Sequence, residues 1–138
     1  MQFPAHCPGE LWHVKKSGFV FWQQLLHALE GVAYWLRLEG DGYSPAFPRL
    51  RVYPELDREA VDQLSKQQLL DYQQKVRAGA ENYFARLTEP LLLEKSLLDP
   101  ELSNLDIILL QIRHLQYHVG HCNSILREAG LPAVGWRE

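Results

Sequence analysis

Apolar side chains recur every three or four residues over a long segment near the start of the chain. The segment runs from about Ser17, a plausible N-cap, to Leu38, and Gly40 follows as a helix terminator. Its apolar positions are Trp22, Leu25, Leu26, Leu29, Ala33 and Leu36. This spacing predicts one amphipathic helix with a buried face.

A second helix is predicted in the middle of the chain. Ser65 and Gln68 have the spacing of a capping box, so we expect the helix to begin near Ser65 and to continue to about Leu87. Many of its residues are Lys, Gln or Arg, which indicates that much of its surface faces solvent.

A third long helix is predicted near the C-terminus. Asp99 before Pro100, and Ser103 three residues before Asp106, both resemble helix starts, so the helix is expected to begin between them. Gly130 and then Pro132 end it near Ala129. Its apolar stripe is expected at Ile108, Ile112, Leu115, Val119, Cys122 and Leu126.

The remaining segments contain many helix-breaking residues. From Glu39 to about Gln63 the pattern is interrupted by Gly40, Gly42, Pro45, Pro48 and Pro54, so a long connection is expected there, anchored by Phe47, Leu50, Val52, Tyr53 and Leu56. The stretch EPLLLEKSLL is a candidate short helix, and Pro4, Pro8 and Gly9 leave room for a short helix at most. No segment has a clear strand pattern. The prediction is an all-α fold in a single domain over residues 1–138.

Composition narrows the classes of partner. The 138 residues carry 14 basic and 17 acidic side chains without a block of one sign, which argues against nucleic acid as a partner. The apolar runs are far shorter than the roughly 20 residues of a membrane helix, and the first residues do not resemble a signal peptide. We therefore expect no membrane partner and a location in the cytoplasm. Two cysteines, Cys7 and Cys122, are too few for a disulfide framework or a thiolate metal site.

The clearest chemical signal is RHLQYHVGH, which places His114, His118 and His121 on one stripe of the third helix. Imidazoles four residues apart on a helix lie one turn apart and can converge on one metal ion. A further ligand must come from a facing helix, and His27 in the first helix is the obvious candidate. The alternative is that the histidines only pack in the core, because an isolated HxxxH pattern is common by chance.

Other histidine chemistries fit the sequence less well. A di-iron carboxylate bundle needs two Glu-x-x-His motifs, but only Glu10 and His13 have that spacing, close to Pro8 and Gly9. Leu115 follows His114 where a zinc protease has its general base. A nucleophilic Ser or Cys site stays open, although no signature supports it.

Two segments resemble the DinB/YfiT-like proteins. FWQQLLHALEGVAYWLR, with a tryptophan five residues before His27, is similar to their first metal-binding helix, and IRHLQYHVGHCNSILREAG is similar to their last helix. The resemblance covers about a quarter of the chain. It implies a four-helix bundle in which His27, His114 and His118 hold one divalent metal ion, zinc or nickel. His121 has no ligand role in this pattern and is expected to be a polar neighbour of the pocket or a surface residue.

The expected chemistry follows from three neutral ligands. They leave a coordination position open, as in catalytic zinc sites, where a bound water or thiol becomes a nucleophile. The expected enzyme is a metal-dependent transferase or hydrolase, and by analogy with some members of the family a thiol-dependent transferase acting on a small molecule is the favoured reaction. A non-catalytic metal- or ligand-binding module and an interaction protein are the alternatives. Glu30, Tyr34 and Gln111 are candidates to orient an imidazole or to contact substrate, with a solvated Glu30 as the alternative.

The resemblance also implies a missing element. Members of the family commonly begin with a long helix before the first ligand helix, and only 16 residues precede Ser17. We expect the proline-rich connection, the tail with Trp136 or a second subunit to cover that side of the bundle. Uncovered apolar surface favours association, so a homodimer is predicted.

Overall fold

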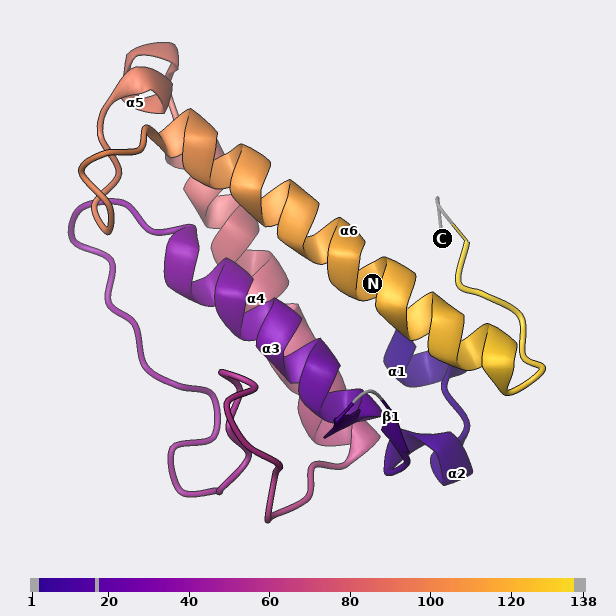
Figure 1. Cartoon of the computed structure of the whole chain (residues 1–138). Helices are drawn as coiled ribbons and strands as arrows, with labels where there is room; N and C mark the ends of the chain where they lie inside the picture. The colour runs from indigo at the N-terminus through magenta and orange to yellow at the C-terminus, as the bar shows by residue number, and fades with distance from the viewer. Residues whose placement is uncertain (1–2, 17, 136–138) are drawn as a thin grey trace.

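The computed structural model describes residues 3–16 and 18–135, and these residues are mostly helical (Figure 1). The elements in chain order are α1 (Phe3–His6), α2 (Gly9–Trp12), β1 (Lys15–Lys16), β2 (Phe19–Val20), α3 (Phe21–Trp35), α4 (Lys66–Arg86), α5 (Glu89–Leu93) and α6 (Asn104–Glu128). The described residues form an all-α fold with one very small hairpin, which confirms the predicted class and the three long helices. The hairpin was not predicted.

Helix α3 is shorter at both ends than the sequence pattern predicts. Lys15 pairs with Val20 across an antiparallel turn, so the chain is still extended until Phe21, and the predicted cap Ser17 lies outside the described residues. At the other end Leu36 leaves the helical conformation, and the Leu38 amide donates to the Asp41 carboxylate at 2.9 Å. Asp41 therefore stabilises a turn over residues 38–41 that contains Gly40 at φ +88°, and the helix has already ended at Trp35, before the glycine.

Helices α4 and α6 begin at the predicted caps. Ser65 and Gln68 form a complete capping box at the start of α4, and Ser103 and Asp106 form another at the start of α6. Helix α6 therefore begins at the later of the two start signals between which it was expected to begin. Gly130 follows the end of α6 with φ +74°, a conformation that glycine adopts without strain.

The buried face of α6 differs from the predicted stripe in its first half. Ile107 is 1% exposed, whereas the predicted core residue Ile112 is 48% exposed. Further along, Cys122 and Leu126 are buried as predicted. The first half of α6 is apolar on more than one side, and periodicity cannot identify the buried side in such a segment.

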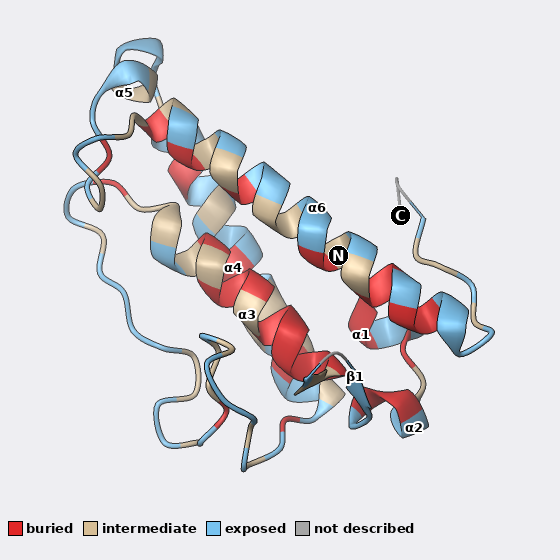
Figure 2. Cartoon of the chain, in the orientation of Figure 1, coloured by how far each residue is buried: buried red, intermediate tan, exposed pale blue. Residues whose placement is uncertain are grey.

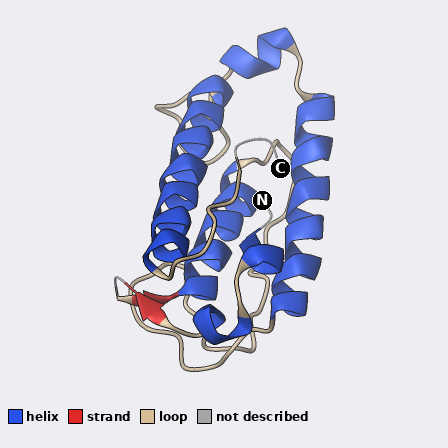
Figure 3. Ribbon diagram, turned by 90° about the vertical axis from the view of Figure 1, so that its right-hand side faces the viewer, coloured by secondary structure: helices blue, strands red, loops and turns tan. Residues whose placement is uncertain are grey.

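Helix α3 is the centre of the molecule. Ten of its fifteen residues are buried, and it packs against both α4 and α6 (Figure 2). Helix α5 bridges the ends of α4 and α6, and the short helices α1 and α2 lie at the opposite end (Figure 3). Phe3, Leu11 and Trp12 join the core there, and the Trp12 indole N–H donates to the Leu64 carbonyl at 2.8 Å. Two short helices thus fill one end of the bundle.

The connection between α3 and α4 packs against the helices without regular structure. Val52 is buried, and Phe47 and Leu50 pack against the core, as predicted, with the Phe47 ring on the Tyr72 ring of α4. The tail after α6 adds Leu131 and Val134 to the core, and Trp136 lies outside the described residues. Within the described ranges, every helix is too short or too polar to cross a bilayer.

Candidate metal centre

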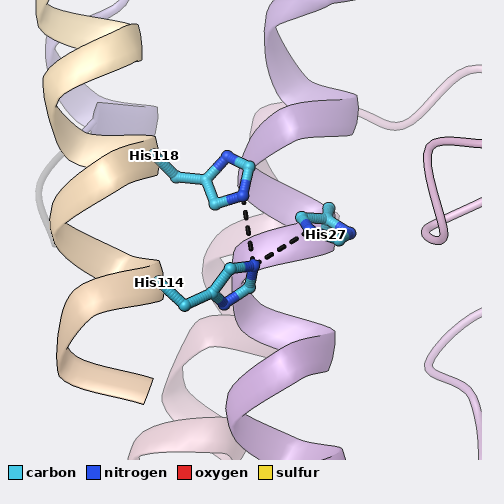
Figure 4. Close-up of side chains that lie close together, drawn as sticks. All are labelled: His27, His114 and His118. Carbon is cyan, nitrogen blue, oxygen red and sulfur yellow. Dashed lines mark hydrogen bonds between the residues drawn. The ribbon is translucent and has the colours of Figure 1, made fainter. Parts of the chain in front are cut away.

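Three histidines from two helices bring their ring nitrogens together. His27 lies in the middle of α3, and His114 and His118 lie one turn apart on α6 (Figure 4). The Nε2 atom of His114 is 2.9 Å from Nε2 of His27 and 3.1 Å from Nε2 of His118. One ring nitrogen from each residue lies within 4.8 Å of the other two. The structure therefore places the three predicted ligands in one cluster.

Burial favours the neutral form of the two imidazoles on α6, His114 and His118. His118 is buried, and desolvation, with further contributions from His27, His114 and His121, lowers its pKa to about 4. The pKa of His114 is also lowered, mainly by burial and then by His27. A neutral imidazole has one nitrogen lone pair free, which is the form that binds a metal ion.

The positions of the ring protons limit the hydrogen bonds that the three histidines can form with one another. His27 Nδ1 lies 2.7 Å from the Pro54 carbonyl, which can only accept, so Nδ1 carries the proton and Nε2 carries a lone pair. If all three rings are neutral, the single Nε2–H of His114 would then have to donate to both His27 Nε2 and His118 Nε2. Nδ1 of His114 and Nδ1 of His118 are buried without a hydrogen-bond partner among the described residues. A cation would instead accept all three Nε2 lone pairs, so the donor set fits a metal ion.

Gly31 provides the space that His114 occupies. A Cβ atom at this position would lie 2.8 Å from Cε1 and 3.1 Å from Nδ1 of the His114 ring. Contacts below 3.0 Å do not persist, so a side chain at position 31 would force the His114 imidazole out of its present position. The position one turn after His27 on α3 is therefore part of the site, although it contributes no ligand.

A polar stripe on α3 fastens the long connection beside the cluster. The Gln23 side chain donates to the carbonyls of Tyr53 and Arg58 at 3.0 and 2.9 Å and accepts from the Ala60 amide at 3.2 Å. His27 donates to Pro54, and Glu30 accepts from the Ala46 amide at 2.9 Å and from the Tyr43 hydroxyl. These residues lie at positions i, i+4 and i+7. Most of the partners of Gln23, His27 and Glu30 are backbone groups of the connection. The spacing of these three residues along α3 therefore does not identify their partners.

The other predicted site residues have different roles. Glu30 is 6% exposed and holds the connection, so it is neither solvated nor hydrogen-bonded to a ligand imidazole among the described residues. Gln111 is 7% exposed beside His114, and its Oε1 atom has no partner in the described structure. Tyr34 is exposed next to Trp35 and Tyr43. His121 is half-buried, and its ring stacks at 6.5 Å on the Tyr117 ring.

A cavity of about 770 Å³ opens beside the histidines. His27 and His114 form part of its lining, whereas His118 lies behind them in the core. Most of the other lining residues are aromatic or apolar, and they come from α3, α6 and the connection. The accessible side of the cluster therefore faces a space of the size that small molecules occupy in proteins.

The chain matches no protein-family model, no curated protein and no solved structure. The resemblance to the DinB/YfiT-like proteins therefore stays a prediction.

Proposed function

We propose that His27, His114 and His118 bind one divalent metal ion, zinc or nickel, through their Nε2 atoms. The convergence of these three atoms carries the proposal. Tetrahedral zinc with Zn–N bonds of roughly 2.0–2.1 Å has ligand nitrogens about 3.3–3.4 Å apart. Two of the observed separations are 2.9 and 3.1 Å, and all three nitrogens lie within 4.8 Å of one another, so the rings reach this geometry by shifting around His114. We further propose that the bundle is of the DinB-like four-helix type, with α1 and α2 in place of its first long helix.

The surroundings of the cluster support a metal with one exchangeable position. The cavity contacts His27 and His114, so a fourth ligand can reach the ion from that side. A divalent ion held by three neutral donors lowers the pKa of a bound water or thiol and produces a nucleophile near neutral pH. The chain's own contribution is to hold the imidazoles: Pro54 orients His27, and Gly31 leaves room for His114.

The reaction we propose is transfer of a low-molecular-weight thiol to a small electrophile. The resemblance to DinB/YfiT-like proteins supports the thiol, and the open position and the cavity support a reaction between two small molecules. Zinc-loaded protein should conjugate cysteine or glutathione with chlorodinitrobenzene or an epoxide, and His118→Ala should lose that activity. Thiol conjugation that is equally fast without metal, or with His118→Ala, would contradict the proposal.

A second candidate is a non-catalytic module that binds a metal and a small ligand. It is favoured by Glu30, the buried carboxylate of the cavity lining, because both of its oxygens already accept hydrogen bonds, from the Tyr43 hydroxyl and the Ala46 amide. Binding of small ligands to metal-loaded protein without any turnover over the same panel would favour this module over the enzyme.

A third candidate is a helical interaction protein in which the histidines only pack. It predicts that the purified chain contains no metal and does not bind added zinc or nickel. The first two candidates predict that the chain binds metal.

A further inference from the structure

Aromatic side chains are concentrated at the cavity beside the histidines. Four Phe, Tyr or Trp side chains are exposed among the described residues, and three of them, Tyr34, Tyr43 and Tyr117, line this cavity. Trp35, which is half-buried, lines it as well. Exposed aromatic surface contributes little to folding, so its concentration around one cavity indicates a surface for contact with a ligand.

The rings are held in place before any ligand arrives. Tyr34 makes edge-to-face contacts with Trp35 and Tyr43, with ring centroids 5.3 and 5.1 Å apart. The Arg37 guanidinium lies 4.8 Å from the Tyr34 ring and 5.3 Å from the Tyr43 ring. Tyr117 belongs to α6, so the rings reach the cavity from two helices and the connection. Rigid aromatic walls bind a flat ring at little cost in side-chain entropy.

The charges near the cavity favour an anionic head group on that ring. Three neutral imidazoles leave both positive charges of a divalent ion uncompensated, and the Arg113 side chain in the lining makes no ion pair with any described residue. Two carboxylates also line the cavity. Glu30 is bound by Tyr43 and Ala46, and Glu55 is exposed on the connection. An anionic atom at the open coordination position would therefore meet the strongest nearby charge directly.

We infer that the cavity binds a flat aromatic molecule with an anionic oxygen or sulfur donor. The donor atom takes the open position of the metal, and the ring lies among Tyr34, Trp35 and Tyr117. The inference rests on the proposed metal site and names the class of molecule that the site takes. An aromatic thiolate is the member of this class that would serve the proposed transfer.

The test uses cobalt-loaded protein and three matched probes. Naphthoate has both the ring and the anion, naphthamide has the ring without the charge, and acetate has the anion without the ring. Binding is measured by calorimetry, and the visible spectrum of the bound cobalt reports whether a probe reaches the metal. Tyr34→Ala and Tyr117→Ala remove rings from the cavity. The matched control is Phe84→Ala, the exposed aromatic residue outside the lining, with the metal content of each variant measured first.

We expect naphthoate to bind roughly tenfold more tightly than naphthamide or acetate and to shift the cobalt spectrum. Each tyrosine variant should weaken naphthoate binding about two- to tenfold, as expected for the loss of one aromatic contact, and Phe84→Ala should not. If cobalt binds but naphthoate is no tighter than acetate, or both tyrosine variants bind it normally, this inference is wrong and the metal site stands. If cobalt and zinc do not bind at all, the proposed function fails and the inference fails with it.

Discussion

At the scale of single residues, the cluster depends on a glycine as much as on its histidines. Gly31→Ala places a methyl group against the His114 ring, and the ring must shift from the position in which its Nε2 atom contacts His27. We expect a loss of zinc affinity of about 10- to 100-fold, the range found when groups that orient metal ligands are changed. Competition with a zinc chelator measures it.

The matched control for this change is Gly79→Ala in α4, where a Cβ atom has nothing within 4 Å. Alanine is the better helix former, so this variant should gain roughly 0.5–1 kcal/mol in the free energy of unfolding and keep its zinc affinity. Equal zinc affinity in both alanine variants would show that position 31 does not control the site.

The same residues show what the sequence can and cannot predict about the site. The one-turn spacing of His114 and His118 and the helical setting of His27 identified the cluster, because helix geometry is local. The roles of Gly31 and of the Pro54 carbonyl depend on how α6 and the connection pack against α3. The hydrogen-bond partners of Glu30 could not be predicted for the same reason, since they lie 13 and 16 residues away in a segment without periodicity.

The two cysteines are expected to be inert in the folded protein. Burial raises the pKa of Cys7 to about 11, partly offset by Lys66, and raises the pKa of Cys122 to about 12. Because a raised thiol pKa leaves almost no thiolate at pH 8, iodoacetamide should label neither residue in native protein and both in guanidinium. Rapid native labelling of either thiol, located by mass spectrometry, would contradict the burial of that cysteine.

At the scale of elements, α3 connects the metal cluster to the long connection. The His27 ring contacts Pro54 through Nδ1 and the cluster through Nε2, so an ion that fixes the ring also fixes the connection. We expect zinc to slow amide hydrogen exchange severalfold at Leu56, Ala60 and Val61, whose amides are hydrogen-bonded within this region.

The control for this measurement is His114→Ala, which keeps the His27–Pro54 hydrogen bond and removes a ligand. Zinc should then have no effect on exchange. Unchanged exchange in the wild type, despite bound zinc, would show that the connection is ordered independently of the site.

The start of a helix could be predicted where neighbouring residues form its N-terminal cap. Ser65 with Gln68 and Ser103 with Asp106 marked the starts of α4 and α6, because a capping box involves only neighbouring residues. The ends of α3 could not be predicted in this way. Its start is displaced by the pairing of Lys15 with Val20, and its end by the turn that Asp41 stabilises.

At the scale of the whole molecule, α1 and α2 fill one end of the bundle and leave other apolar surface uncovered. Leu109 and Ile112, less than one turn apart on α6, are 55% and 48% exposed. The predicted homodimer stays a prediction, and this face is where we expect it. The variant with Leu109→Glu and Ile112→Glu should sediment as a monomer when the wild type sediments as a dimer.

Gln116→Glu provides the control for the dimer, because it adds a negative charge one turn after Ile112 at an already exposed polar position. It should leave the dimer intact. A wild type that sediments as a monomer over the whole concentration range would show that the homodimer prediction is wrong. The proposed metal site would not be affected.

The most direct test of the central claim is the metal content of purified protein after exposure to zinc and removal of excess ion, measured by elemental analysis. We predict one zinc ion per chain in the wild type and in His121→Ala, and none in His27→Ala, His114→Ala or His118→Ala. A wild type that holds no zinc, or the three ligand variants retaining it, would contradict the account.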